Sequence, residues 1–198
     1  SFGEAFVSVG DEVIVTEAEH HSNIVPWQML CQRKGAFLKV VPVDDDGYLM
    51  LDKLESLISD KTRIVAVTHI SNVLGLINPV KDIVSICHSR GVPVLIDGAQ
   101  GAVHCRVDVQ DYDCDFYVFS GHKLYAATGT GVVYGKRKWL EKMPPFMCGG
   151  EMVGTVSFEK TTFAPLPMKF EAGTQNFASA ATLKPAIEFL KLLNDNNL

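Results

Sequence analysis

Most of the side chains able to do chemistry lie in four polar clusters, each of which follows a short apolar stretch of the sequence. The clusters are Glu19-His20-His21-Ser22-Asn23, His69-Ile70-Ser71-Asn72, Asp97-Gly98-Ala99-Gln100 and Ser120-Gly121-His122-Lys123. Each residue alone has an ordinary structural interpretation, for example Asp97 as a helix cap or Lys123 as a surface charge. If the apolar stretches are parallel strands, however, all four clusters lie at one edge of a sheet, where open α/β sheets bind their ligands.

The residue types at this edge fit a pyridoxal 5′-phosphate (PLP) site better than a nucleotide site. The sequence contains neither the G-x-G-x-x-G fingerprint of dinucleotide-binding folds nor a Walker lysine loop. A PLP site needs a lysine that forms an imine, a carboxylate at the pyridine nitrogen and donors for the phosphate. All three kinds of group are present, with Lys123 as the lysine and Asp97, at the end of a buried strand, as the carboxylate.

The composition is that of one ordinary globular domain. The chain has 198 residues, of which 47% are hydrophobic and 21% charged, and its formal net charge is −5. No basic stripe favours nucleic acid, and no apolar run approaches the roughly 18 residues that a membrane span needs. The five cysteines are scattered without a C-x-x-C pair, so neither a disulfide framework nor a zinc site is indicated. We expect a cytoplasmic protein that acts on a small molecule.

A metal site is not expected either. The neighbouring residues His20 and His21 invite that interpretation, but adjacent side chains rarely converge on one ion, and no third ligand is evident.

Short β-rich runs alternate with helical patterns along the chain. The predicted strands are Val13 to Thr16, Phe37 to Val41, Ile64 to Thr68, Val92 to Ile96 and Phe116 to Phe119. Their continuous apolar character is typical of strands buried on both faces of a largely parallel sheet with right-handed crossovers. The run from Gly131 to Tyr134 follows the fifth strand too closely for a helical crossover, so we predict an antiparallel edge strand there. The predicted fold class is α/β, a three-layer α/β/α arrangement around a mostly parallel mixed sheet.

Helical patterns fill the intervals between the predicted strands. The clearest helix has Asn78 as its N-cap, Pro79 as its first residue and Gly91 as its stop. Two further apolar stripes predict helices over residues 51–58 and 24–33, and Pro26 should interrupt the second one early.

The last third of the chain shows a weaker pattern. We expect loops to dominate from Lys138 to Phe170. A final helix with its apolar stripe from Ala186 to Leu193 should follow a cap at Ser179, and Pro185 should either bend it or lie in its first turn.

Taken together, the polar clusters and their flanking residues resemble the class V aminotransferase family of fold-type I PLP enzymes, and most closely its group II cysteine desulfurases and the related selenocysteine lyases. The similarity extends from Gly10-Asp11 to Glu171-Ala172-Gly173-Thr174, which is nearly the whole chain. The matching blocks between these ends span residues 19–27, 68–75, 94–100, 113–116 and 120–125. Their order and spacing are far more specific than the tetrapeptide around Lys123 alone.

The resemblance implies a role for each candidate residue. Lys123 would form the imine with PLP and later move the Cα proton, and Asp97 would pair with the pyridinium nitrogen. Gln100 would bind the phenolic oxygen, while His20 would stack on the ring and help in proton transfer. The remaining implied contacts are with the phosphate from Ser120 and His122, with the ring or substrate from Asn72, and with the phosphate of a homodimer partner from Thr174.

The implied reaction removes sulfur from L-cysteine and leaves L-alanine and an enzyme persulfide, which a sulfur-acceptor protein receives, for example in iron–sulfur cluster assembly. In the family, the nucleophilic cysteine and a carboxylate-binding arginine belong to the C-terminal part, and a phosphate-binding loop precedes the segment that begins here at Ser1. We therefore expect residues 1–198 to be a single PLP-binding large domain, a fragment that lacks the N-terminal segment and the C-terminal small domain and is itself inactive.

Three alternatives stay open. The first is a selenocysteine lyase that acts on L-selenocysteine. The second is another class V activity, such as an aminotransferase or a kynureninase-like hydrolase, although the blocks around His20 and Lys123 argue against it. The third is a non-catalytic dimerising scaffold. Among the cysteines, only Cys148 lies in a loop that could expose a nucleophile, and it falls where the family usually has glycine.

Overall fold

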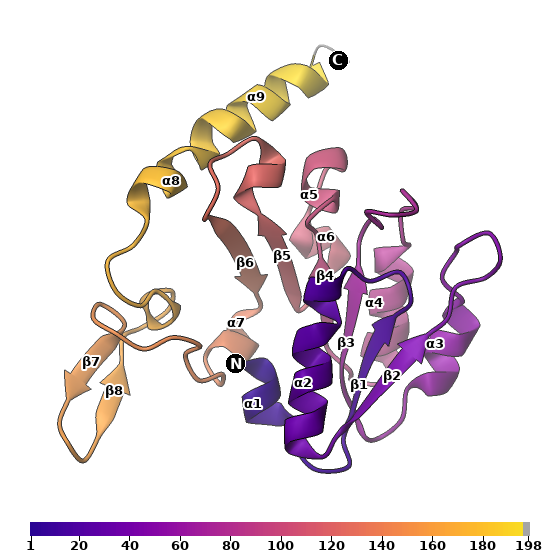
Figure 1. Cartoon of the computed structure of the whole chain (residues 1–198), viewed down its shortest axis with the longest axis horizontal. Coiled ribbons are helices and arrows are strands. Elements are labelled where there is room, and N and C mark those ends of the chain that lie inside the picture. The colour runs from indigo at the N-terminus through magenta and orange to yellow at the C-terminus, as the bar shows by residue number, and fades with distance from the viewer. Residues whose placement is uncertain (196–198) are drawn as a thin grey trace.

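A six-stranded mixed sheet forms the centre of the computed structural model, which describes residues 1–195 (Figure 1). Its strands are β1 (Glu12–Thr16), β2 (Phe37–Val41), β3 (Thr62–Thr68), β4 (Val94–Asp97), β5 (Phe116–Ser120) and β6 (Gly131–Gly135). The strand order is β2-β1-β3-β4-β5-β6; the first five strands pair in parallel, and β6 is antiparallel to β5. The predicted mixed sheet and its antiparallel edge are therefore confirmed.

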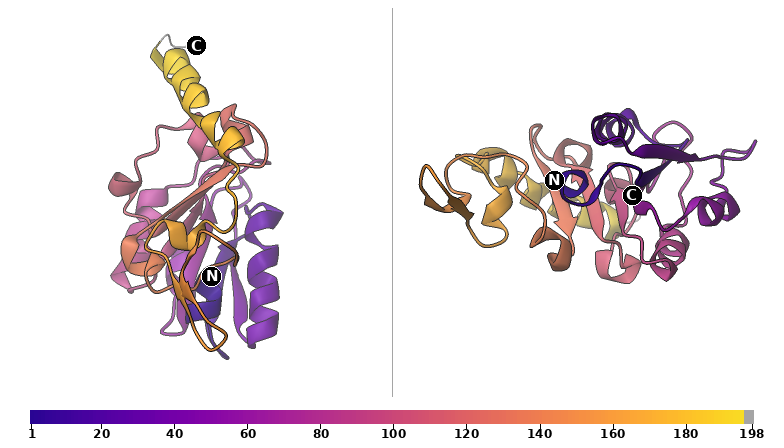
Figure 2. Two further views of the ribbon diagram at one scale, coloured as in Figure 1. Left: turned by 90° about the vertical axis from the view of Figure 1, so that its left-hand side faces the viewer. Right: turned by 90° about the horizontal axis from the view of Figure 1, so that it is seen from below.

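Helices cover both faces of this sheet, and each face has its own hydrophobic core. On one face lie α1 (Phe2–Phe6), α2 (Val25–Lys34) and α7 (Arg137–Leu140). On the other face lie α3 (Leu51–Leu57), α4 (Val80–Ser89), α5 (Gly101–His104) and α6 (Val109–Tyr112). The view from below in Figure 2 shows the sheet between these two layers. The three-layer α/β/α fold predicted from the sequence is confirmed.

Successive residues of the central strands supply the two cores in turn. Val13 and Ile64 pack in the core under α1 and α2, whereas the next residues, Ile14 and Val65, pack in the core under α3 and α4. All four side chains are fully buried. Because side chains alternate between the faces of a strand, a sheet covered on both sides needs apolar residues at consecutive positions. This requirement explains the continuous apolar runs in the sequence.

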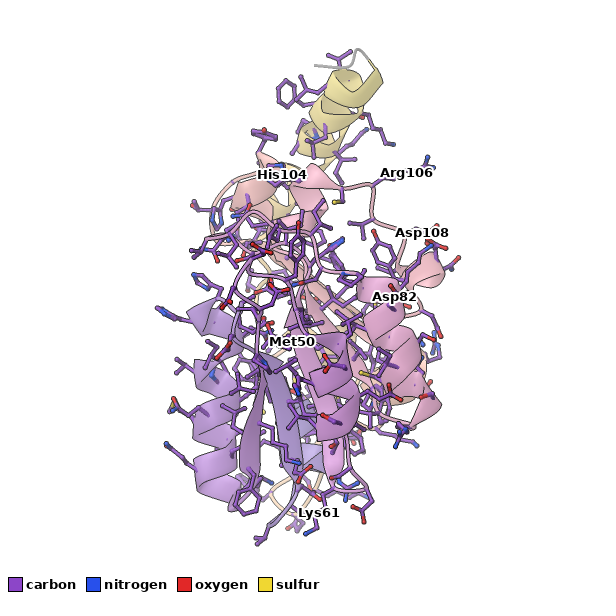
Figure 3. The ribbon with its side chains drawn as sticks, turned by 90° about the vertical axis from the view of Figure 1, so that its right-hand side faces the viewer. Met50, Lys61, Asp82, His104, Arg106 and Asp108 are labelled. Atoms are coloured by element: carbon purple, nitrogen blue, oxygen red, sulfur yellow. The ribbon has the colours of Figure 1, made fainter. Side chains whose placement is uncertain are left out.

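The starts and ends of the parallel strands lie at opposite ends of the molecule. Figure 3 shows Lys61, which precedes β3, at one end, and His104, which ends the helix after β4, near the other. At the carboxyl edge, β1 leads to the 3₁₀ helix η1 (His21–Asn23), and β5 leads to the 3₁₀ helix η2 (Gly121–Leu124). The sheet thus gathers three of the polar clusters at one edge, together with the His69–Asn72 loop after β3.

Apart from one-residue shifts at the ends of α2 and α3, the helices between the strands differ from the sequence prediction at two points. The N-cap of α4 is Pro79 rather than Asn78. The Asn78 side chain instead donates a hydrogen bond to the carbonyl oxygen of Thr68 at 2.8 Å, which ties the helix entry to the end of β3. Pro26 lies in the first turn of α2 and does not interrupt it, because proline is tolerated where no intrahelical N–H donor is needed.

The last third of the chain contains more regular structure than predicted. A β-hairpin of β7 (Val153–Val156) and β8 (Thr161–Phe163) lies in the segment expected to be loop, and its residues are largely exposed, so no apolar pattern marks it. The η3 turn (Met168–Phe170), α8 (Phe177–Ala181) and α9 (Leu183–Asp195) follow. In Figure 1 the hairpin and α9 project from the body of the sheet.

The cap predicted at Ser179 is wrong, because the side chain of Asn176 caps α8 by accepting a hydrogen bond from the Ser179 N–H. Pro185 is the third residue of α9 and so lies in its first turn, one of the two alternatives left open by the sequence.

Candidate active site

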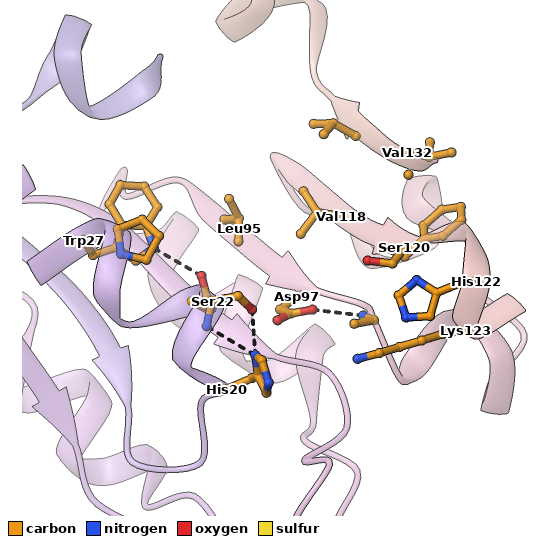
Figure 4. A pocket seen from close by; sticks show the side chains of 16 residues that line it. His20, Ser22, Trp27, Leu95, Asp97, Val118, Ser120, His122, Lys123 and Val132 are labelled. Carbon is orange, nitrogen blue, oxygen red and sulfur yellow. Dashed lines mark hydrogen bonds between the residues drawn. The ribbon is translucent and has the colours of Figure 1, made fainter. Parts of the chain in front are cut away.

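A cavity of about 690 Å³ opens at the carboxyl edge of the sheet. Side chains from the segments after β1, β4 and β5 and from β6 line it (Figure 4). Five of the residues predicted for the site lie in this lining: His20, Asp97, Ser120, His122 and Lys123. Three strands that are far apart in the sequence therefore bring their terminal residues to one space, as the parallel-sheet interpretation requires.

Asp97 is the last residue of β4 and is 7% exposed. It pairs in register with Thr68 of β3 and Val118 of β5, so strands flank it on both sides. One carboxylate oxygen, Oδ1, accepts a hydrogen bond from the backbone N–H of Ala99 at 2.9 Å. That bond fixes the carboxylate at the carboxyl end of β4, where Figure 4 shows it facing the cavity.

Lys123 lies in η2, immediately after β5, and is half-buried. In Figure 4 its side chain extends across the cavity toward Asp97 and His20. The Lys123 amine makes no hydrogen bond or ion pair with any residue that the structure describes. The short helix is held by the Gly121 N–H, which donates to the carbonyl oxygen of Thr130 at 2.8 Å, and it ends at Tyr125 in a left-handed conformation with φ of 65°.

The imidazole of His20 is oriented by its own loop. Its Nδ1 accepts a hydrogen bond from the Ser22 backbone N–H at 3.2 Å and lies 2.8 Å from the Ser22 hydroxyl. Because a backbone N–H can only donate, Nδ1 carries no proton in this arrangement, and the proton of the neutral ring is on Nε2. The exposed ring is thus free to present Nε2 or its face to a ligand in the cavity.

Glu19 is a buried carboxylate that the sequence reasoning did not select. It is 7% exposed, and its oxygens accept hydrogen bonds from Thr16, Asn23 and the Thr68 backbone. Burial raises the pKa of Glu19 to about 7 against the effect of these donors, and the nearby Asp97 charge adds to the rise. The available signal in the sequence was an acidic residue directly before His20, at the end of a strand.

Three predicted residues lie outside this cavity. Asn72 and Gln100 line a separate hollow of about 450 Å³ together with His104. Thr174 is exposed in the loop between η3 and α8. Their roles therefore stay predictions.

The cysteines divide by burial. Cys31, Cys87 and Cys114 are buried, Cys105 is half-buried and Cys148 is exposed. Burial raises the pKa of the Cys87 thiol to about 12, which makes it inert as a nucleophile.

Within residues 1–195, no three His, Cys, Asp or Glu side chains are grouped in a way that could hold a metal ion. The helices of this part of the chain are too short or too polar to cross a membrane.

Comparison with known proteins assigns the chain to a family. The sequence profile of the aminotransferase class-V family matches residues 1–197. The chain belongs to the aminotransferase class-V family. Among its curated relatives, a cysteine desulfurase from Cronobacter sakazakii is 52% identical over 199 aligned positions, which cover 100% of this chain and 49% of that protein. The chain therefore spans about half the length of the curated relatives it matches.

Two solved structures agree with the fold. The cysteine desulfurase CsdA from Escherichia coli, in an S-sulfonic acid form, has a TM-score of 0.92 and 45% sequence identity over 98% of this chain and 48% of its own. A mutant of the protein C-DES, with glycine covalently linked to its PLP cofactor, has a TM-score of 0.82 and 25% identity over 98% of this chain and 52% of its own.

Proposed function

We propose that this chain is the PLP-binding large domain of a cysteine desulfurase, which removes sulfur from L-cysteine and leaves L-alanine and a persulfide on an enzyme cysteine. The observation that carries the proposal is the convergence of Lys123 and Asp97 on one cavity from different strands. The 52% identity to a protein named cysteine desulfurase supports this choice among PLP-dependent activities.

The residues of the cavity fit the groups of PLP. Asp97 offers a carboxylate oxygen, beside the one bound by Ala99, to a protonated ring nitrogen. The Ser120 hydroxyl and the His122 imidazole lie on the side of the cavity that carries Lys123, where they would bind the phosphate. Lys123 would hold the cofactor covalently, and its amine forms no ion pair with residues 1–195 that would have to be broken first.

PLP supplies an electron sink for the bond that breaks at the substrate Cα. The protein groups supply proton transfer and orientation. Lys123 Nζ would remove and return the proton at Cα, because its side chain crosses the cavity. Asp97 would offer a carboxylate oxygen to the ring nitrogen, and His20, with Nε2 available, would cover the ring and hold a proton at that atom.

The sulfur chemistry needs a thiolate that residues 1–195 do not place in the cavity, since none of the five cysteines is among the residues that line it. We therefore place the nucleophile in a part of the longer protein outside this sequence. The proposal also includes a homodimer in which Thr174 reaches the phosphate of the partner subunit, a sulfur-acceptor protein and a cytoplasmic location.

Covalent capture of the cofactor tests the proposal. After PLP is added and the imine that it forms with the protein is reduced with borohydride, mass spectrometry should find the pyridoxyl group on Lys123. The Lys123→Ala variant should lose the label, whereas Lys53→Ala, an exposed position on α3, should keep it. In the presence of a thiol reductant such as dithiothreitol, which reduces the enzyme persulfide and is itself oxidised to the disulfide, the full-length protein should form alanine and release sulfide from L-cysteine. Labelling of other lysines with none on Lys123 would contradict the proposed cofactor site.

A further inference from the structure

The carboxylate of Glu19 joins three segments at the edge of the sheet. Its Oε1 accepts hydrogen bonds from the Thr16 hydroxyl at 2.6 Å and from the Thr68 backbone N–H at 2.8 Å. Its Oε2 accepts a hydrogen bond from the Asn23 side-chain amide at 2.7 Å. One buried group thus connects the end of β1, the end of β3 and the η1 turn.

The hydrogen bonds continue from Asn23 into the wall of the cavity. The indole N–H of Trp27 donates to Asn23 Oδ1 at 3.1 Å. Because an indole N–H can only donate, it fixes the orientation of the Asn23 amide and directs the NH₂ group to Glu19. Both Asn23 and Trp27 line the proposed cofactor cavity, whereas Glu19 does not.

This network lies between two residues of the proposed site. Thr68, which donates to Glu19, pairs in register with Asp97 on the neighbouring strand. Glu19 also directly precedes His20, so the carboxylate anchors the loop that carries the His20 ring. Five residues of this segment form one wall of the cavity, here called the His20–Trp27 wall: His20, Ser22, Asn23, Pro26 and Trp27. A displacement of Glu19 would therefore move this wall relative to Asp97.

A carboxylate is the group that this position requires. Each of its two oxygens faces one donor whose direction cannot be reversed, the Thr68 N–H on Oε1 and the Asn23 NH₂ on Oε2. A glutamine has one oxygen and one NH₂ group, so it would set donor against donor at one of the two places. A buried mismatch of this kind leaves polar groups without a partner.

We propose that Glu19 is a positioning residue that holds the His20–Trp27 wall of the cavity against the end of β3 and thereby determines the affinity for PLP. This inference rests on the proposed function. Glu19 is not among the residues that line the cavity, and it acts through Asn23, Trp27 and His20.

A set of exchanges at positions 19 and 23 tests the proposal. Glu19→Gln should weaken PLP binding about tenfold at pH 8, the effect expected for one lost buried hydrogen bond. Asn23→Asp should also weaken it, because two carboxylates would then face each other. The double variant Glu19→Gln/Asn23→Asp restores complementary pairs, since the new amide at position 19 can donate to the new carboxylate at position 23, which still accepts from Trp27. We expect its affinity to return to within about threefold of the wild type.

The matched control is Glu17→Gln. Glu17 lies in the same loop and accepts a hydrogen bond from the Val43 N–H at 3.0 Å, but it is exposed and outside the cavity. This variant should bind PLP as the wild type does. Hydrogen exchange of the segment 17–27 in PLP-free full-length protein gives a second readout, and it should be faster in Glu19→Gln and restored in the double variant.

The outcomes separate the two proposals. Absence of PLP binding in the wild type overturns the proposed function, and the hydrogen-exchange comparison then decides whether Glu19 holds the wall. Binding of PLP by both wild type and Glu19→Gln with equal affinity overturns the inference alone. If Glu19→Gln fails to fold, the comparison of Asn23→Asp with the double variant decides, and a double variant no better than Asn23→Asp overturns the inference.

Discussion

The Tyr117 hydroxyl lies 2.9 Å from Nδ1 of His69, in a buried pair that packs against the turn following Asp97. The turn contains glycine at the two points of closest approach. A Cβ atom at Gly98 would lie 2.0 Å from the Tyr117 ring, and one at Gly101 would lie 2.2 Å from His69 Nδ1. The Tyr117–His69 pair therefore fixes how near the turn can lie to the sheet, and so the place of Asp97.

A methyl group at Gly98 should be strongly destabilising. Gly98→Ala inserts an atom into the Tyr117 ring, and we expect a loss of about 3 kcal/mol in the free energy of unfolding. Gly150→Ala is the matched control, because a Cβ there meets no atom within 4 Å, and its effect should stay within about 0.5 kcal/mol. Urea unfolding followed by circular dichroism measures both, and equal stabilities would contradict the tight approach.

Removal of the Tyr117 hydroxyl should leave Nδ1 of the buried His69 ring without this hydrogen-bond partner. Burial lowers the pKa of His69 and so favours the neutral ring in the folded protein. We expect Tyr117→Phe to lose about 1–2 kcal/mol of unfolding free energy. Tyr48→Phe, at an exposed position, should lose almost none. Thermal unfolding of the two variants side by side tests the difference.

The stability of the protein should carry a pH dependence that belongs to Glu19. The pKa of this group is raised to about 7 in the folded protein against an ordinary value of 4.5. At a pH below 4.5, Glu19 is protonated in both the folded and the unfolded protein, and its stabilising effect is fully present. As the pH rises toward 7, the unfolded protein loses this proton first, so the free energy of unfolding falls by up to about 3 kcal/mol. The difference in unfolding free energy between wild type and Glu19→Gln should therefore shrink between pH 4.5 and 7. A constant difference over this range would mean that Glu19 is not perturbed.

A second buried carboxylate, Asp115, should be essential for stability at the opposite edge of the sheet. Its side chain, 1% exposed, accepts hydrogen bonds from His88 at 2.7 Å, from Trp139 at 2.7 Å and from the Val94 N–H at 3.0 Å. Burial acts to raise the pKa of Asp115, but these donors and Lys136 hold it below the ordinary value. The ionised Asp115 side chain thus stabilises the folded protein above pH 3.8, and this stabilisation is lost as the pH falls.

Asp115→Asn places an amide NH₂ against these donors and should lose about 2–4 kcal/mol at neutral pH. Asp113→Asn is the control, because Asp113 is 65% exposed and has the left-handed backbone that asparagine tolerates. Its effect on urea unfolding should be below about 1 kcal/mol. Similar losses in the two variants would contradict a special role of burial at Asp115.

Much of the fold and part of the candidate site could be predicted from sequence alone. The apolar runs located the strands to within two residues, because a sheet covered on both faces leaves a continuous pattern. The polar residues after these runs therefore had to lie at the carboxyl edge of the sheet, and His20, Asp97 and Lys123 do line one cavity there. The β7–β8 hairpin was missed because its exposed residues carry no apolar signal.

The sequence by itself determined which residue types reach the carboxyl edge of the sheet, since chain direction in parallel strands follows from the order of strands and helices. Only the tertiary structure decided how they are held there. The bond between Glu19 and the Thr68 N–H joins residues 49 positions apart, and Asn78 binds the Thr68 carbonyl instead of capping its helix. Such contacts depend on the spacing between strands and on the burial of single polar atoms, which no local pattern records.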